Sequence, residues 1–186
     1  MIKTMIKKIA VLVLALVFIG CSEGDILEIP LDIFSDDELQ NCSNENDNTF
    51  VFFVIDGDTN RSLSVNFTDS NFEIEPATIA DISVDEPIVI TLNTTTNQLL
   101  YREFDTVIDG DDYFCNSVPV SNVNVTQELI SSNGTVEISY TLQNTTGTET
   151  IYERTVTLND VTLEGNGIAI RRELLVLGTD SVTITN

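Results

Sequence analysis

Short alternations of apolar and polar residues run along most of this chain after residue 26. Segment 27–33 alternates aliphatic with mainly acidic residues, segment 50–55 is an unbroken apolar run, and segment 63–67 alternates again. Alternation with period two predicts a strand with one buried face, and a short continuous apolar run predicts a central strand covered on both faces. Proline cannot donate to a strand ladder, so Pro30 restricts the first segment to a sheet edge or a strand start.

The second half of the chain shows the same pattern more densely. Asn133-Gly134 is the strongest short-range hairpin signal, and it predicts a tight turn into a returning strand at 136–142. On that strand Val136, Ile138, Tyr140 and Leu142 share one face. Polar residues separate the other predicted strands and form a loop over 105–118. These strands lie at 88–92, 98–104, 123–125, 129–130, 151–158, 161–163, 168–177 and 182–184.

Nine or ten strand candidates at short spacing, with no convincing helix, predict an all-β protein. Valine, isoleucine, threonine and phenylalanine dominate these segments, as is typical of strands. We expect an antiparallel β-sandwich with one core between two sheets, forming a single domain over residues 35–186. The chain has no tryptophan, so the immunoglobulin fold is only an analogy.

The leading segment has the architecture of a secretory signal peptide. Lys3, Lys7 and Lys8 precede an apolar run over 9–19, which ends in Gly20-Cys21. A basic region and a run of roughly 7–15 apolar residues before a small residue describe such a peptide. The run is shorter than the roughly 20 residues that a membrane-spanning helix needs. We expect residues 1–20 to be removed.

The end of that segment, Leu16 to Cys21, resembles the lipobox of bacterial lipoproteins. The resemblance implies cleavage before Cys21 and attachment of lipid, including palmitate, to its sulfur, with 21–34 as a tether and first edge strand. The alternative is an ordinary signal peptide with Cys21 as a spare thiol. The acidic stretch Ser22-Glu23-Gly24-Asp25 looks like the export signal of Bacteroidota lipoproteins. It implies an outer-membrane protein facing the cell exterior, with the periplasmic face as the alternative.

Charge excludes several classes of function. The formal net charge is −22, and loss of residues 1–20 removes all three lysines and no acid, which makes it −25. A field this negative repels phosphate backbones, so we expect no nucleic-acid partner. The chain has no histidine, which excludes histidine-based triads and histidine-ligated zinc. Paired carboxylates are the remaining route to hydrolysis, and no pair stands out, so we expect a protein that is not an enzyme.

Two cysteines remain in the predicted domain. In an exported chain, Cys42 and Cys115 are most simply interpreted as one disulfide. Two free thiols are the alternative.

Two acidic stretches raise the question of calcium. Asp56, Asp58 and Asn60 place oxygen atoms at alternate positions of a turn, and calcium takes six to eight oxygen ligands. A second group, in the loop before Cys115, consists of Asp109, Asp111 and Asp112. Neither stretch has the spacing of an EF-hand, and Asp-Gly also forms turns without any metal. Apart from the lipid and this calcium alternative, we expect no cofactor.

Two arginines occupy the apolar phase of their predicted strands. Arg102 lies between Leu100 and Phe104, and Arg154 lies between Tyr152 and Val156. An inward arginine needs a carboxylate partner, whereas at a sheet edge its guanidinium reaches solvent. We favour the edge position, with Arg102 pairing an acid near 105–109 as a hypothesis.

A wider resemblance covers most of the mature chain. Gly24-Asp25-Ile26, Cys42, the stretch 101–105, Tyr113 to Asn116 and Pro119 are similar to a Bacteroidota lipoprotein family without an assigned activity. The resemblance implies the compartment and the cysteine pair, and no function.

These observations favour a non-catalytic, lipid-anchored surface protein with an interaction or envelope-structural role. Its partner, protein or glycan, is not specified by any motif. The alternative is a carbohydrate-binding accessory lipoprotein of a polysaccharide-uptake system, which calls for tyrosine rings on one exposed face. A third hypothesis, a carboxylate-based hydrolase, calls for a cleft with a carboxyl pair of raised pKa.

Overall fold

The computed structural model describes residues 31–34, 38–44, 49–56, 58, 60–68, 76, 78–116 and 120–186. The predicted signal peptide and Cys21 lie outside the described residues. Within them, no helix is long and apolar enough to cross a membrane. Nine strands make up most of the described chain: β1 (Gln40–Asn44), β2 (Thr49–Asp56), β3 (Arg61–Thr68), β4 (Ile88–Thr91), β5 (Asn97–Phe104), β6 (Val125–Ser131), β7 (Thr135–Thr145), β8 (Glu149–Gly165) and β9 (Ile168–Thr185).

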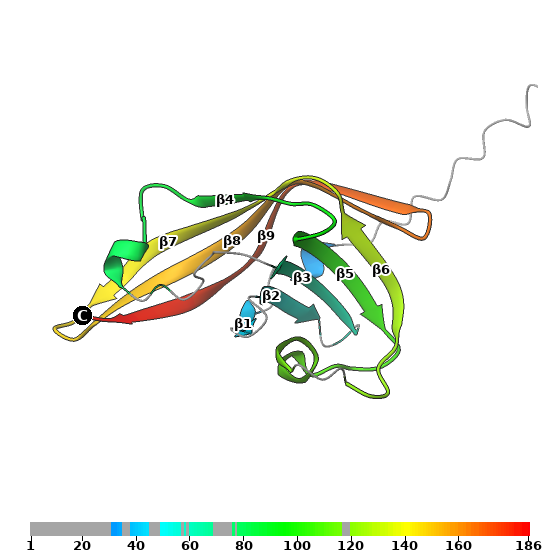
Figure 1. Cartoon of the computed structure of the whole chain (residues 1–186), viewed down its shortest axis with the longest axis horizontal. Helices are drawn as coiled ribbons and strands as arrows, with labels where there is room; N and C mark the ends of the chain where they lie inside the picture. The colour runs from blue at the N-terminus through cyan, green and yellow to red at the C-terminus, as the bar shows by residue number, and fades with distance from the viewer. Residues whose placement is uncertain are drawn as a thin grey trace, which may run out of the picture.

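All strand pairs are antiparallel, which confirms the predicted all-β class. Hydrogen bonds link the nine strands into one open sheet in the order β1-β2-β3-β5-β6-β8-β7-β4, and β9 pairs with β8. We call β1, β2, β3, β5 and β6 the five-strand wing, and β4, β7, β8 and β9 the four-strand wing (Figure 1). The two layers expected of a sandwich are therefore wings of one sheet. Among the described strands, backbone pairing links the two wings only between Ile130 and Ser131 of β6 and Glu164 and Leu163 of β8.

One hydrophobic core unites the two wings. Phe52, Leu63 and Tyr101 of the five-strand wing belong to the same cluster of buried side chains as Ile138 and Leu158 of the four-strand wing. The predicted central strand is confirmed, because the residues from Phe50 to Val54 are all at most 7 % exposed. One face of β2 meets the core, and the other is covered by the segment that carries Cys115.

The two Asn-Gly pairs behave differently, and the predicted hairpin at Asn133-Gly134 is wrong. β6 and β7 do not pair with each other; both pair with β8, one after the other along the same edge. The chain therefore crosses from one wing to the other at this point. Asn166 (φ 53°) and Gly167 (φ 79°) instead form the tight turn between β8 and β9, with the positive angles of a hairpin turn.

Side-chain hydrogen bonds hold the crossing in place. The Asn133 side chain accepts a hydrogen bond from the backbone N–H of Thr162 at 2.9 Å, and Ser131 Oγ donates to the Asn133 carbonyl at 2.6 Å. Gly134 has φ +97°, and a Cβ there would lie 2.7 Å from the Asn159 carbonyl oxygen. The crossing therefore requires glycine for both its angle and its close contact.

Several predicted boundaries change. Leu31–Phe34, expected at the end of an edge strand, is a 3-10 helix, η2, that buries Leu31 and Phe34 three residues apart. The strands expected at 161–163 and 182–184 are continuous with their predecessors in β8 and β9. Leu142 was expected to share a buried face with Tyr140, but it is 53 % exposed, and the rest of β7 from Thr141 onward is exposed as well.

Candidate functional site

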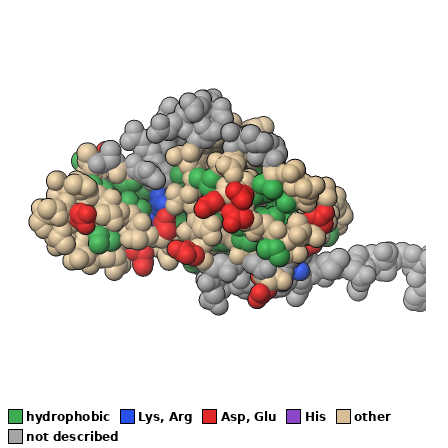
Figure 2. Space-filling model, turned by 90° about the horizontal axis from the view of Figure 1, so that it is seen from below, with side chains coloured by type: hydrophobic (Ala, Val, Ile, Leu, Met, Phe, Trp, Pro, Cys, Tyr) green, Lys and Arg blue, Asp and Glu red, His purple; other side chains and the backbone are tan. Residues whose placement is uncertain are grey.

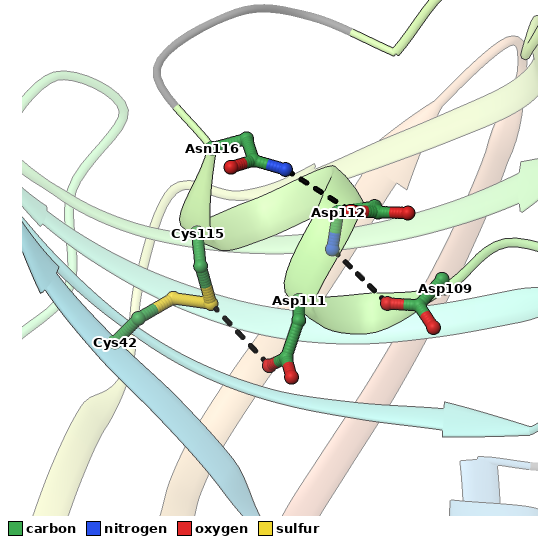
Figure 3. Close-up of a disulfide and its surroundings, with 6 residues drawn as sticks. All are labelled: Cys42, Asp109, Asp111, Asp112, Cys115 and Asn116. Carbon is green, nitrogen blue, oxygen red and sulfur yellow. Dashed lines mark hydrogen bonds between the residues drawn. A yellow bond between two sulfur atoms is a disulfide. The ribbon is translucent and has the colours of Figure 1, made fainter.

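A disulfide fixes an irregular segment to the outer face of the five-strand wing. Cys42 of β1 bonds to Cys115, with 5.6 Å between their Cα atoms, which confirms the predicted pairing (Figure 3). Cys115 ends a short π-helical turn, η4 (Asp111–Cys115), inside the segment that was expected to be a plain loop. The bond therefore joins two segments 73 residues apart in sequence.

Aromatic rings pack this segment onto β2. Phe114 stacks on Phe53 with 4.4 Å between ring centroids, and Tyr113 contacts both Phe114 and Phe104 edge-on at 4.9 Å. Gly110 precedes the turn, and a Cβ there would lie only 2.5 Å from the Phe53 ring. Ring packing and the disulfide thus hold Phe114 and its neighbours in one position.

A cavity of about 310 Å³ lies beside the disulfide. Three adjacent strands supply its floor, since Cys42, Val51 and Asn66 are direct cross-strand neighbours on β1, β2 and β3. The end of η4 supplies the opposite wall through Phe114, the disulfide and Asn116. The remaining lining residues come from the same ends of the three strands: Ser43, Thr49, Phe50, Phe67 and Thr68.

Among the residues that the structure describes, none that lines this cavity carries a formal charge. The Asn66 amide donates to Ser64 Oγ at 3.2 Å, and the Asn116 amide donates to the Asp112 carboxylate at 3.1 Å. The carbonyl oxygen of Asn116 points away from Asp112 (Figure 3). Thr68 Oγ donates toward the Thr95 and Thr96 carbonyls. Each of these three side chains therefore donates a hydrogen bond to another group of the protein and has an oxygen atom that can accept a hydrogen bond from a ligand.

The acidic residues of the second predicted calcium group surround the π-helical turn. The Asp109 carboxylate accepts a hydrogen bond from the Asp112 N–H at 3.1 Å, and an Asp111 oxygen lies 3.7 Å from the Cys115 sulfur. All three carboxylates are exposed. In Figure 2 acidic side chains gather near the middle of the face on which this turn lies. They place negative charge around the disulfide and its cavity.

The first predicted calcium group forms the turn between β2 and β3. The Asp56 carboxylate accepts a hydrogen bond from the Asp58 N–H at 3.1 Å, and Asn60 adopts the left-handed conformation with φ 53°. Among the described residues, no group of three or more histidine, cysteine, aspartate or glutamate side chains could hold a metal ion. These bonds favour the turn-forming role for Asp56, Asp58 and Asn60, and the calcium sites stay a prediction.

The four-strand wing carries a second polar cluster, centred on Arg154. Arg154 was expected at a sheet edge, but it is 2 % exposed and faces the core. Its guanidinium forms a two-point pair with the Asp180 carboxylate and lies 4.7 Å above the Phe52 ring. Asp180 also accepts a hydrogen bond from the Asn41 amide at 2.9 Å. The register of β8 against β9 puts Asp180 directly opposite Arg154. This carboxylate balances the buried guanidinium charge, so the inward position is tolerated.

A cavity of about 480 Å³ borders this cluster, between the free edges of β1 and β9 among the described strands. The two edges touch at Leu39 and Gly178, where a Cβ on the glycine would lie 2.9 Å from Leu39 Cβ. Asn41, Arg154 and Asp180 line the cavity but bond one another. The cluster therefore serves the packing of the two edges, and the cavity beside the disulfide is the stronger candidate for a binding site.

Two further expectations concerned Arg102 and the tyrosines. Arg102 pairs with Glu128, directly opposite on β6 (2.7 Å), and not with an acid near 105–109 as proposed. Tyr101, Tyr140 and Tyr152 are at most 5 % exposed. Burial, and then the hydrogen bond to Glu103, raise the pKa of the Tyr101 hydroxyl. The exposed tyrosine rings that the carbohydrate-binding alternative called for are therefore not present among these three, and that alternative loses the support it required from them.

Sequence reasoning missed Asn66, Phe114 and Asn116 as site residues. They come from β3 and from the end of η4. Phe114 and Asn116 fall in a stretch that carries the family resemblance, but the resemblance implied no role for them. The predicted disulfide was the one available signal, because pairing Cys42 with Cys115 brings the neighbours of both cysteines together. Comparison with protein-family models, with curated proteins and with solved structures found no match to this chain.

Proposed function

We propose that this chain is a lipid-anchored, non-catalytic binding protein of the bacterial outer membrane, and that it holds its ligand in the cavity beside the disulfide. The observation that supports the proposal is the construction of that cavity. Its walls come from three strands and from a segment fixed by a disulfide and a ring stack. A preformed site loses little conformational entropy when it binds, which favours affinity.

The chemistry of the lining supports binding over catalysis. The cavity offers amide and hydroxyl groups and the ring of Phe114, and none of its described lining residues is an acid, a base or a free thiol. Its volume falls within the range of about 300–1,000 Å³ that is typical of small-molecule sites. Such a lining can orient a ligand, but it offers no side chain for proton transfer.

The experiment is a melting assay of the mature chain, residues 21–186, in detergent micelles. Neutral saccharides and short peptides are added one class at a time. A ligand present at about one hundred times its dissociation constant adds about 2.7 kcal/mol to the stability of the folded state. We expect one class to raise the melting temperature of the wild type and not of Thr49→Trp, which fills the cavity. Mass spectrometry of the recovered ligand should show it unchanged; a cleaved ligand would contradict the non-catalytic role.

The anchor is tested separately. Each buried methylene of an acyl chain contributes about 0.8 kcal/mol, and stable attachment takes more than one chain. Cells grown with labelled palmitate should incorporate it into the wild type and not into Cys21→Ala, and the variant should leave the membrane fraction. Equal labelling of both proteins would remove the anchor from the proposal without affecting the cavity.

Surface exposure is the third part. Protease added to intact cells should digest the wild type. Replacing the acidic residues Glu23 and Asp25 together with alanine should protect it, by retaining the protein on the periplasmic face. Protection of the wild type itself would favour the periplasmic location.

A further inference from the structure

We infer that the cavity beside the disulfide binds a neutral, hydroxyl-rich ligand, a saccharide unit, through acceptor oxygens on Asn66, Thr68 and Asn116 and the ring of Phe114. This inference rests on the proposed binding function and names the ligand class of the same site. No motif of the sequence assigns it.

The first argument is the balance of donors and acceptors. Asn66 and Asn116 each donate an amide hydrogen to a protein oxygen, Ser64 Oγ and Asp112 respectively. Thr68 Oγ donates its hydrogen toward backbone carbonyls. An amide carbonyl has two lone pairs, and a hydroxyl that has spent its hydrogen can still accept. The site is thus rich in acceptors, and it suits a ligand that carries several O–H donors.

The second argument is the absence of charge. The lining residues that the structure describes carry no formal charge, although the mature chain has a net charge of −25. Asp111 and Asp112 stand just outside, so an anionic ligand would meet repulsion on approach. A cation would find no carboxylate among these described lining residues. Both considerations favour a neutral ligand.

The third argument is the aromatic ring. Phe114 is half-buried, stacks on Phe53 and still borders the cavity. An aromatic ring carries a negative face that attracts the polarised C–H groups of a sugar ring, while the sugar hydroxyls meet the neighbouring oxygens. A peptide backbone has one N–H donor per residue, whereas a sugar unit has several O–H donors. A peptide would therefore satisfy fewer of the acceptor oxygens in the cavity. The saccharide is therefore favoured over the peptide.

The test is calorimetric titration of the mature chain in detergent with neutral saccharides that end in glucose, galactose, mannose or N-acetylglucosamine. A matching set that ends in uronic acids and a set of short neutral peptides serve as comparisons. We expect at least one neutral saccharide to bind. Asn66→Leu and Asn116→Leu should each weaken it at least tenfold, because each removes one acceptor without adding charge. Thr141→Leu, on an exposed position of β7, is the matched control and should bind as the wild type does.

The disulfide offers an independent readout. The double variant Cys42→Ser, Cys115→Ser should lose at least tenfold in affinity, because Phe114 and Asn116 are no longer fixed to β1. Near-ultraviolet circular dichroism checks that the variant keeps its packed core, and a reductant titration of the wild type gives the same comparison if the variant does not fold.

The outcomes separate the inference from the function it rests on. Saccharide binding that both Asn66→Leu and Asn116→Leu leave unchanged would place the ligand elsewhere and overturn this site. Binding of peptides and of no saccharide would overturn the ligand class while keeping the binding function. Tighter binding of uronic acids than of neutral sugars would also overturn the inference. If no class binds, both proposals fail together.

Discussion

Two arginines with the same sequence signature end in opposite surroundings. Arg102 and Arg154 both lie in the apolar phase of a strand, and both pair with an acid directly opposite on the next strand. Arg102 and Glu128 are 24 % and 48 % exposed, whereas Arg154 and Asp180 are 2 % and 12 % exposed. Periodicity shows which side chains share a face of the strand, but not which face the core will cover. The desolvation cost of an arginine charge depends on whether its face is covered.

The physical difference between the pairs is solvation. Water solvates both charges of the Arg102 pair, so their attraction adds little to stability. Arg154 is out of water, and its charge is met by Asp180 and by the face of the Phe52 ring. Removing one member of a buried pair leaves the other desolvated and unbalanced. The two pairs should therefore respond very differently to the same substitution.

The largest effect is expected for Asp180→Ala. The substitution leaves the buried guanidinium without its carboxylate and should cost about 3–5 kcal/mol of the free energy of unfolding. Urea denaturation monitored by circular dichroism measures it. As a control, the double variant Arg154→Met, Asp180→Leu should recover most of the loss, because an apolar pair of similar size carries no charge to solvate. A loss under 1 kcal/mol for the single variant would show that the pair behaves like a surface pair.

The second-largest effect is expected at alkaline pH, where ionisation of Tyr140, beside Arg154, should lower the free energy of unfolding. Tyr140 lies directly opposite Arg154 across β7 and β8, and burial raises the pKa of its hydroxyl, although Arg154 acts in the opposite direction. The folded protein therefore holds the neutral phenol at a pH where the unfolded chain, with a pKa near 10, ionises. Stability should be constant below about pH 10 and fall above it.

Urea midpoints from pH 8 to pH 11.5 test this expectation. Tyr140→Phe should show a shallower decline than the wild type, and Tyr101 accounts for part of what remains, since its pKa is also raised. Identical slopes for wild type and Tyr140→Phe would rule out a contribution from this hydroxyl.

Glu128→Ala should have a small effect. It removes the partner of a half-exposed arginine, and such pairs contribute about 0–1 kcal/mol. The difference from wild type should shrink further in 1 M salt, where the screening length is about 3 Å. The same urea experiment, run at low salt and in 1 M salt, measures the loss of stability under both conditions. A loss as large as that of Asp180→Ala would contradict the contrast between the two pairs.

The smallest effect is expected at Asp105, on the exposed side of the five-strand wing. Hydrogen bonds from the Asn124 side chain and backbone lower the pKa of this carboxyl, which is fully exposed. Its contribution to stability is therefore present above the unfolded pKa and is lost as pH falls through the lower folded pKa. Titration by carbon-detected magnetic resonance should show the lowered pKa in the wild type and a smaller lowering in Asn124→Ala, which loses the side-chain donor and keeps the backbone N–H.

Local sequence predicted the strands well and their partners poorly. The run from Phe50 to Ile55 predicted a strand covered on both faces, because six apolar residues in a row leave no polar face. Asn133-Gly134 and Asn166-Gly167 carry the same dipeptide, yet only the second is a hairpin. The difference lies in a bond from the distant Thr162 N–H to the Asn133 side chain, which no local pattern contains.

The candidate site shows the same limit more strongly. Cys42 and Cys115 could be paired from composition and the predicted compartment alone, since a domain that is expected to be exported and contains two cysteines has one possible pairing. Asn66, Phe114 and Asn116 are polar and aromatic residues of ordinary kinds at unrelated positions. Only the register of β1 against β2 and β3, together with the disulfide, brings them to one cavity.

The crossing at Asn133 and Gly134 also sets the order in which strand partners become available as the chain is made. Every strand of the five-strand wing, and both cysteines of its disulfide, precede residue 132, so the pairings within that wing can form once 131 residues have emerged. β8 and β9 are adjacent in the chain and close locally around their turn. β4 differs from these strands because it has no partner nearby in the chain: Ile88 pairs with Ile138, 50 positions later. Pairings that span such distances form slowly. The β4–β7 pairing spans more sequence than any other strand pairing among the described residues, so we expect β4 to join the sheet slowly.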